Sequence, residues 1–468
     1  MINHPNDDTI AAISTAPGVG GIAVIRISGK QAIEIASVIF KPIKKSLCIE
    51  SAKAYQAIYG TILHQGEEID KVLTTIFRAP HSFTGEDVVE ISCHGSIYIQ
   101  QRILNILIDN GCRLANAGEF TQRAFINGKM DLSQAEAVAD LINSQSKVAH
   151  TVAMNQMKGV FSSKLAELRD KLLHLVSLLE LELDFGDHEE LEFADRSEII
   201  KITKELYTEV TKLTASFSIG NAIKNGIPVS IIGNTNVGKS TLLNHLIGEE
   251  KAIVSDIPGT TRDIIEDVIN INGITFRFLD TAGIRNTDDS IEKIGIERSY
   301  NAITHSQIVI WVIDSSNFAT EEINKIKHHL QNSGKIIIAV INKIDIATQQ
   351  QIETIHKELV DTNYEIIEIS AKNELNTESL RTTLYDKAGL DNYGNNDIII
   401  SNMRHYEALS HAQESIQRII DGLENNIPSD FIAQDVRETI FHLAEITGGE
   451  ITTPEVLSNI FSKFCIGK

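Results

Sequence analysis

The segment that decides the fold reads Val229-Ser-Ile-Ile-Gly233-Asn-Thr-Asn-Val-Gly238-Lys239-Ser240, a short apolar run followed by the pattern GxxxxGK[ST]. A strand, this pattern and a helix in succession are typical of a P-loop, whose backbone N–H groups wrap the phosphates of a nucleotide. In such a loop Lys239 neutralises β- and γ-phosphate oxygens, and Ser240 offers its hydroxyl to Mg²⁺. The motif predicts a nucleoside triphosphate site within an α/β domain.

The alternation of strand and helix continues downstream of this loop. Asn272-Gly273 is a strong two-residue hairpin signal between two of the strands, and helical patterns fill the other gaps. We therefore predict a doubly wound, mostly parallel sheet with one antiparallel strand. The predicted strands cover residues 229–232, 264–271, 274–279, 308–313, 336–341 and 364–369.

Four further motifs follow the P-loop in the order found in Ras-like GTPase domains. Thr260 and Thr261 precede the second strand, and Asp280-Thr281-Ala282-Gly283 ends the third. Asn342-Lys343-Ile344-Asp345 follows the fifth strand and Ser370-Ala371-Lys372 the sixth. Both resemble base-reading motifs, in which the aspartate accepts hydrogen bonds from guanine N1 and N2. Adenine cannot supply these donors, and an unpaired buried acceptor costs about 1–3 kcal/mol, so the motifs predict GTP rather than ATP.

The residue directly after Gly283 is Ile284, where Ras-like GTPases carry a glutamine that orients the attacking water. An isoleucine cannot do this. An external activator or another internal residue must supply the effect.

The length, charge and cysteine content of the chain limit the classes of protein to which it can belong. The chain has 468 residues, enough for several domains, and a formal net charge of −21. Proteins whose main task is to bind nucleic acid usually carry a positively charged surface. Any RNA that this chain binds must therefore contact a local positive patch or be bound with the help of a partner protein. The apolar runs are strand-length, the first ten residues show no secretory signal, and the four cysteines form no CxxC pair. We therefore predict a cytoplasmic protein with no membrane span, zinc knuckle or disulfide framework.

The pattern of apolar residues divides the chain into four segments. The first mixes short strand-like runs with turns and predicts an α+β domain, whereas the second and fourth show apolar stripes at helical spacing. We expect the α/β domain to be inserted into a helical domain that two chain segments form together. The predicted segments are residues 1–120 (α+β), 121–224 (helical), 225–384 (GTPase) and 385–468 (helical, ending in the motif CIGK).

Motifs along the whole chain resemble those of the MnmE (TrmE) family of tRNA modification GTPases. The GTPase motifs alone would admit many relatives, but their combination with the C-terminal motif is specific. The motifs that carry the resemblance are GGIAVIRISG (20–29), SFTGEDVVEISCHG (82–95), GEFTQRAFINGKMDLSQAEAVADLI (118–142), GTTRD (259–263), IEKIGIERS (291–299) and FCIGK (464–468).

The resemblance implies a GTPase domain that dimerises across the nucleotide, with K⁺ in place of an arginine finger. Asn236, Ser255, Ile257 and Thr260 would hold K⁺, while Ser240 and Thr261 would hold Mg²⁺. Glu292 would position the attacking water through a bridging water, which answers the question raised by Ile284. With Lys239 it is a candidate catalytic residue. The expected GTP contacts are Asn234, Asn236, Val237, Gly238, Lys239, Ser240, Thr241, Ser255, Ile257, Thr260, Thr261, Asp280, Thr281, Ala282, Gly283, Asn342, Lys343, Asp345, Ser370, Ala371 and Lys372.

The resemblance also implies a 5-formyl-tetrahydrofolate-type one-carbon donor bound by the N-terminal domain, which would take part in dimerisation. Arg26, Glu90, Lys129 and Lys468 match the positions implicated in the family. From the residues alone, Arg26 and Glu90 are instead interpreted as a salt bridge between strands. Cys465 matches a cysteine that matters for modification and is a third candidate catalytic residue. Its alternative is a buried helical cysteine, and a prenylation signal is a poor fit to the residues that follow it.

By the same resemblance, the chain forms a homodimer and a heterotetramer with an FAD-containing partner, MnmG (GidA). Together they would add a carboxymethylaminomethyl or aminomethyl group at C5 of the wobble uridine of certain tRNAs, with the flavin on the partner. Residues 404–468 hold five bases and ten acids, so no basic RNA-binding tail exists. Two alternatives are a regulatory RNA- or ribosome-associated GTPase without modification chemistry and a folate-dependent enzyme acting on a small molecule. Neither uses all the predicted domains.

Overall fold

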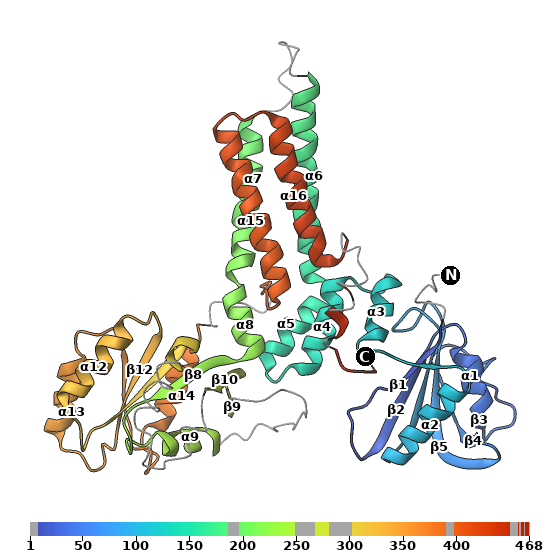
Figure 1. The fold of residues 1–468 in the computed structure, drawn as a ribbon, viewed down its shortest axis with the longest axis horizontal. Coiled ribbons are helices and arrows are strands. Elements are labelled where there is room, and N and C mark those ends of the chain that lie inside the picture. The colour runs from blue at the N-terminus through green and yellow to red at the C-terminus, as the bar shows by residue number, and fades with distance from the viewer. Residues whose placement is uncertain are drawn as a thin grey trace. The chain divides into compact units, whose positions relative to one another are not determined.

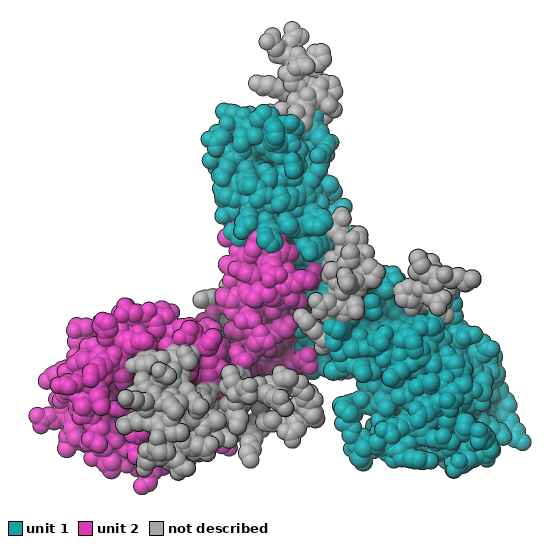
Figure 2. Space-filling model, viewed as in Figure 1, with its two compact units in different colours: residues 1–142, 154–207, 411–468 teal, residues 143–153, 208–410 magenta. Residues whose placement is uncertain are grey.

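The computed structural model describes residues 8–185, 196–248, 267–279, 302–389, 397–449, 457, 460–462 and 464–467. These residues form two compact units, coloured in Figure 2. The first contains residues 1–142, 154–207 and 411–468, and the second contains residues 143–153 and 208–410. The boundaries of the four predicted segments stay predictions.

The first unit contains a seven-stranded sheet with the order β3-β4-β5-β6-β2-β1-β7. All neighbouring strands are antiparallel except β1 and β7. Helices α1 and α2 contact the sheet and bury an aliphatic core between themselves and its strands, as an α+β domain requires. The prediction of an α+β domain is confirmed. The elements are β1 (Ile10–Ile13), β2 (Gly20–Ser28), α1 (Ala32–Ile39), β3 (Phe40–Pro42), β4 (Gln56–His64), β5 (Glu67–Phe77), β6 (Val88–Gly95), α2 (Ile97–Asp109) and β7 (Arg113–Leu114).

Helices from distant parts of the chain complete this unit. In Figure 1, α6 (Val160–Phe185) lies beside α16 (Ser429–Thr447), and the two helices pack against each other. Arg437 Nη2 and Glu180 Oε1 form an ion pair across them at 3.0 Å. The apolar stripe predicted for this segment is buried at Leu165, Leu168, Leu172, Leu175 and Leu179, and the side chain of Leu183 lies outside the described part.

Three short helices follow β7 along the chain, and the last two of them, like two long helices, contribute residues to both units. The short helices are α3 (Glu119–Ile126), α4 (Leu132–Asn143) and α5 (Lys147–Met157). The long ones are α7 (Arg196–Ala215) and α15 (Met403–Glu424). On α15 the predicted stripe is buried at Leu409, Ile416, Ile420 and Leu423. Among the described residues, no helix is both long and apolar enough to cross a membrane.

The second unit is built on a six-stranded sheet with the order β13-β12-β11-β8-β10-β9. Every pair is parallel except β10 with β9, which form the hairpin predicted at Asn272-Gly273. Separate apolar clusters form around the sheet with helices from its two sides, so the prediction of a doubly wound, mostly parallel sheet is confirmed. The elements are α8 (Phe217–Asn225), β8 (Ile227–Ile232), α9 (Lys239–Gly248), β9 (Asp267–Ile271), β10 (Ile274–Phe278), β11 (Ile308–Asp314), α12 (Thr320–Gln331), β12 (Ile336–Asn342), α13 (Gln349–Leu359), β13 (Glu365–Glu368) and α14 (Thr377–Lys387).

Candidate functional site

The P-loop joins β8 to α9, as the sequence predicted. Gly233 and Gly238 have φ values of 144° and 103°, which L side chains rarely adopt. A Cβ on Gly233 would collide with the carbonyl oxygen of Val312, and one on Gly238 would collide with the amide of Asn342. The loop therefore depends on glycine at both positions and keeps its backbone in the tight form that phosphate binding needs.

Lys239 begins α9 and folds back over the loop. Its Nζ donates hydrogen bonds to the carbonyl oxygens of Gly233 at 2.7 Å and Asn234 at 2.6 Å. Burial lowers the pKa of Lys239, because a charged ammonium is less well solvated there. These two carbonyls hold the ammonium at the loop, from which it can exchange them for phosphate oxygens.

Asn342, at the end of β12, connects the base-reading segments to the P-loop. Its Nδ2 donates to the carbonyl of Val237 at 2.8 Å, and its Oδ1 accepts from the backbone N–H of Ala371 at 2.9 Å. Asn342, Val237 and Ala371 are all buried. Leaving their polar groups unpaired would cost more than forming these hydrogen bonds, so the bonds are strongly favoured. A single side chain thus joins the phosphate loop, the NKxD segment and the SAK segment.

Asp314, which the sequence analysis did not identify, supports the next residue of this motif. Lys343 Nζ donates to the carbonyl of Asn236 at 2.7 Å and to Asp314 Oδ2 at 2.6 Å. Burial acts to raise the pKa of Asp314, but hydrogen bonds from Lys343 and Ser316 outweigh it and hold the pKa below its ordinary value. The only sequence signal was a polar residue at the carboxyl end of a buried parallel strand, where α/β folds place ligand sites.

Asp345, the predicted guanine-reading residue, is also held in place by a neighbour. Its Oδ2 accepts from Asn373 Nδ2 at 3.0 Å. Ser370 is buried and its Oγ accepts from the backbone N–H of Asn373 at 3.3 Å, while Lys372 is exposed. Asn373 therefore links the two base-reading segments, and nothing in the spacing of the motifs pointed to it.

The other described P-loop residues differ in their surroundings. Asn234 Nδ2 donates to Glu322 Oε2 at 2.6 Å, and Val237 is buried. Asn236 is exposed with a left-handed φ of 61°, and Thr241 is exposed. The predicted site residues that lie outside the described part of the chain are Ser255, Ile257, Thr260, Thr261, Asp280, Thr281, Ala282, Gly283, Glu292 and Lys468.

In the first unit, Arg26 and Glu90 face each other on neighbouring strands. They are paired in the β2–β6 register, and Arg26 Nη2 lies 2.8 Å from Glu90 Oε1. The strand salt bridge expected from the residues alone is confirmed. Each side chain keeps about a quarter of its surface exposed, at 21% and 26%. The guanidinium carbon of Arg26 also lies 5.5 Å from the ring centres of both Phe83 and Phe120.

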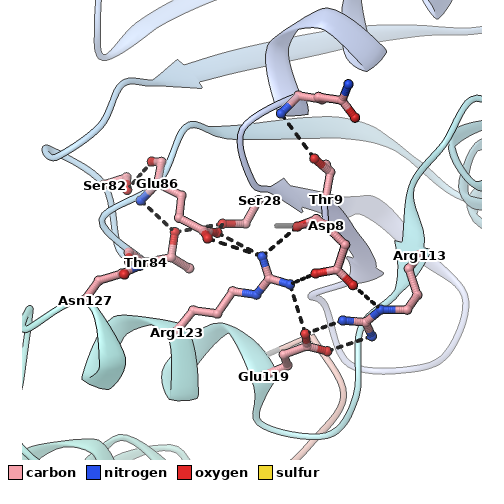
Figure 3. A network of polar contacts seen from close by, with 11 residues as sticks. Asp8, Thr9, Ser28, Ser82, Thr84, Glu86, Arg113, Glu119, Arg123 and Asn127 are labelled. Atoms are coloured by element: carbon pink, nitrogen blue, oxygen red, sulfur yellow. Dashed lines mark hydrogen bonds and ion pairs between the residues drawn. The ribbon is translucent and has the colours of Figure 1, made fainter. Parts of the chain in front are cut away.

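Beside this pair lies a buried polar network that the sequence analysis missed (Figure 3). Arg123 is only 2% exposed and contacts three carboxylates, at 2.6 Å to Asp8, 3.2 Å to Glu86 and 3.1 Å to Glu119. Arg113 pairs with Glu119 and Asp8 from the other side. The available sequence signal was the spacing of Glu119 and Arg123, four residues apart on one helix face.

The C-terminal tail also reaches the N-terminal domain within this unit. The backbone N–H of Gly118 donates to the carbonyl of Cys465 at 3.3 Å, and Ser14 Oγ donates to the carbonyl of Gly467 at 3.0 Å. Cys465 lies outside any helix and is exposed. The alternative of a buried helical cysteine is therefore wrong. The tail is attached through hydrogen bonds that its backbone carbonyl groups accept. Lys129, the remaining described candidate, donates its Nζ to the carbonyl of Pro80 at 2.9 Å.

Across the described residues, no group of three or more His, Cys, Asp or Glu side chains is arranged to hold a metal ion. The expected Mg²⁺ and K⁺ ligands are instead hydroxyl, amide and carbonyl groups. Of these, Ser240 and Asn236 belong to the described P-loop.

Two family models match the chain. One, described as the MnmE helical domain, matches residues 132–465, and one described as the GTP-binding protein TrmE N-terminus matches residues 9–129.

Full-length relatives agree with these matches. A protein of Parabacteroides distasonis named tRNA modification GTPase MnmE is 55% identical over 466 residues, covering 98% of this chain and 100% of its own. A protein of the same name from Bacteroides thetaiotaomicron is 53% identical over 468 residues, covering 99% and 100%. Among solved structures, translation elongation factor SelB from Methanococcus maripaludis aligns at 21% identity with a TM-score of 0.27, covering 35% of this chain and 34% of its own. A similarity that low carries no argument about fold or function.

Proposed function

Since the chain belongs to the MnmE family of tRNA modification GTPases, we propose that it hydrolyses GTP to GDP and phosphate as part of a tRNA modification reaction. The observation that best supports the GTPase part of this proposal is the position of Asn342, whose side chain forms hydrogen bonds with both the P-loop and the SAK segment. That arrangement fixes the base-reading groups relative to the phosphate loop, as a guanine-specific hydrolase requires.

In this proposal residues of the second unit bind and orient the nucleotide. The loop from Gly233 to Gly238 surrounds the phosphates with backbone N–H groups, and Lys239 neutralises charge on the β- and γ-phosphates. Ser240 and Thr261 would hold Mg²⁺, and Asp345 accepts from the guanine N–H groups. Water attacks the γ-phosphorus and the bond to the β–γ bridging oxygen breaks, with Glu292 holding the water in line.

Monovalent cation dependence is the second part of the proposal. Asn236, Ser255, Ile257 and Thr260 would hold K⁺ beside the phosphates, where two GTPase domains meet across the nucleotide. A fixed cation there neutralises the charge that develops during cleavage, as an arginine finger does elsewhere. The exposed side chain of Asn236 and its left-handed backbone, held by Lys343 at the carbonyl, support its assignment as a ligand.

Replacing Asn236 with alanine is expected to abolish the preference for K⁺ while leaving guanine binding nearly intact. The carboxamide oxygen that would ligate K⁺ is lost, whereas Asn342 and Asp345 are untouched. Turnover measured in KCl and in NaCl, beside GDP affinity, tests this. Equal turnover of the unmodified protein in the two salts would contradict the K⁺ assignment.

The modification chemistry is the third part. Arg26, Glu90, Lys129 and Lys468 would hold a 5-formyl-tetrahydrofolate-type donor, with Cys465 close to it. With the FAD-containing partner MnmG, a homodimer of this chain would build an aminomethyl or carboxymethylaminomethyl group at C5 of the wobble uridine. The exposed thiol of Cys465, on a tail attached to the N-terminal domain, supports a functional role for it.

Nucleoside analysis of bulk tRNA tests the whole proposal. Cells would carry as their sole copy the wild type, Lys239→Ala or Cys465→Ser. We expect the wild type to restore C5-modified wobble uridine and both variants to lose it. Loss in Lys239→Ala alone would remove Cys465 from the chemistry. Normal wobble uridine in cells without the protein would favour a regulatory GTPase instead.

A further inference from the structure

Asp314 is a buried carboxylate at the carboxyl end of β11, and its two oxygen atoms have different partners. Its Oδ1 accepts hydrogen bonds from the backbone N–H of Ser316 at 2.9 Å and from Ser316 Oγ at 2.6 Å. Its Oδ2 accepts from Lys343 Nζ at 2.6 Å, and the Asp314 side chain is only 9% exposed. Because Ser316 fixes one oxygen, the other stays in place for the Lys343 ammonium, and their charge-assisted bond is roughly twice as strong as a neutral one.

The sheet sets the position of this carboxylate relative to the base-reading segment. Asp314 is paired with Asn342 in the parallel register of β11 and β12, and Ser315 Oγ donates to the carbonyl of Asn342 at 2.6 Å. Lys343 follows Asn342 directly along the chain. The contact between Asp314 and Lys343 is therefore built on two adjacent strands rather than on a loop.

The Lys343 ammonium connects Asp314 to the P-loop through a second acceptor. Its Nζ also donates to the carbonyl of Asn236 at 2.7 Å. Lys343 and Asn236 both have left-handed backbones, with φ values of 66° and 61°, which residues other than glycine rarely adopt. Such conformations persist only where the surrounding structure holds them. Since the Lys343–Asn236 bond joins both of these residues, losing the carboxylate that anchors the ammonium is expected to loosen the P-loop at Asn236.

We propose that Asp314 is a positioning residue for GTP hydrolysis: through Lys343 it fixes the backbone of Asn236 and so keeps the Asn236 carboxamide where it would ligate K⁺. This inference rests on the proposed function, to which it adds a residue that would touch neither the nucleotide nor the cation. Asp345, which would read guanine, is held by Asn373 instead. Loss of Asp314 is therefore expected to affect the cation site more than base recognition.

GTP turnover of the full chain in a KCl series tests this, with choline chloride keeping the ionic strength constant. Asp314→Ala is expected to raise the K⁺ concentration for half-maximal turnover on the order of tenfold, because a loosened Asn236 must be ordered when the cation binds. GDP affinity is expected to stay within about threefold, since the contacts of Asp345 are untouched. Asp314→Asn keeps an oxygen acceptor for Lys343 without the charge and is expected to raise the half-maximal concentration only about two- to threefold.

Crystal structures of the nucleotide-free wild type and Asp314→Ala test the positioning step without a measurement of activity. We expect Lys343 Nζ to stay on the carbonyl of Asn236 in the wild type and to leave it in the variant. Asn236 is then expected to leave the left-handed region or to take several conformations. The same bond and the same backbone in both structures would overturn the proposal.

Glu365→Ala is the matched control, because it breaks another carboxylate–lysine pair on the same sheet, with Lys387 at 2.8 Å. It is expected to change neither the K⁺ response nor GDP affinity. In an Asn236→Ala background the K⁺ ligand is already lost, so adding Asp314→Ala is expected to change turnover by less than about twofold. Trp311 fluorescence shows whether each variant is folded, and if Asp314→Ala is not, Asp314→Asn decides the question in its place.

The outcomes separate this inference from the function on which it rests. Equal turnover of the wild type in KCl and NaCl would remove K⁺ from the proposed function, and the role of Asp314 would fail with it. A wild type that prefers K⁺, beside an Asp314 variant with the same half-maximal K⁺ concentration, would overturn the role of Asp314 alone. Equal losses of K⁺ response and GDP affinity would also overturn it, because Asp314 would then support the nucleotide pocket as a whole.

Discussion

Lys239→Ala is expected to lower kcat/KM for GTP hydrolysis on the order of 10²–10³-fold, the range seen when one preorganised donor to a developing oxyanion is removed. The Lys239 ammonium sits at the P-loop on the carbonyls of Gly233 and Asn234, where phosphate oxygens would replace those carbonyls. Charge accumulates on these oxygens as the γ-phosphate leaves, so the ammonium contributes more in the transition state than in the ground state. Phosphate release at saturating Mg²⁺ and K⁺ measures the loss.

Comparing GDP affinity with GTP turnover distinguishes a catalytic role of Lys239 from a structural one. GDP lacks the γ-phosphate, and in the proposed site Asp345 would read guanine with support from Asn342, so GDP affinity is expected to fall much less than turnover. Lys325→Ala, at an exposed lysine of α12 in the same unit, is the control for loss of a positive charge. Trp311 is the only tryptophan of the chain and is buried in this sheet, so its fluorescence reports whether the unit stays folded. Turnover of Lys239→Ala within threefold of wild type would contradict the assignment.

The second unit could be predicted in detail because its signals are local. A P-loop, a hairpin dipeptide and two base-reading motifs each occupy a few consecutive residues, and short connections with right-handed crossovers leave few ways to join the strands. The observed sheet has the predicted strands and a single antiparallel neighbour. Asp314 and Asn373 escaped prediction because their roles depend on contacts with Lys343 and Asp345 across the sheet edge.

The first unit was less predictable because its site is assembled from distant segments. The Arg26–Glu90 salt bridge could be foreseen, since both residues lie in strand-like runs with mixed polarity. The carboxylates that surround Arg123 come from positions 8, 86 and 119, which no sequence period connects. The helical alternative for Cys465 failed for a related reason, because the tail is attached through long-range hydrogen bonds that its own backbone carbonyl groups accept, and these leave no pattern in the tail's side chains.

Arg123→Met is expected to destabilise the N-terminal domain by about 3–5 kcal/mol, the cost of breaking a buried ion pair by removing one partner. Methionine approximates the length of the arginine but leaves Asp8, Glu86 and Glu119 facing one another with Arg113 as the remaining cation of the network. Amide hydrogen exchange in β2 and β6 measures the loss locally. Trp311 fluorescence follows the other unit and is expected to report an unchanged transition. Arg102→Met, at a half-exposed arginine of α2, controls for the loss of an arginine as such.

The loss of stability caused by Arg123→Met is also expected to depend on pH. Burial acts to raise the pKa values of Asp8 and Glu119, but hydrogen bonds from Arg113 and Arg123 outweigh it and hold both below their ordinary values of 3.8 and 4.5. A carboxylate whose pKa is lowered by folding stabilises the protein above its ordinary pKa, and this contribution disappears as the pH falls and the group is protonated. The difference between wild type and Arg123→Met is therefore expected to be full at pH 7 and to shrink below about pH 4. An equal difference at both pH values would mean that Arg123 stabilises the domain through packing rather than through its carboxylates. No difference at either value would mean that desolvation of the buried charges cancels their attraction.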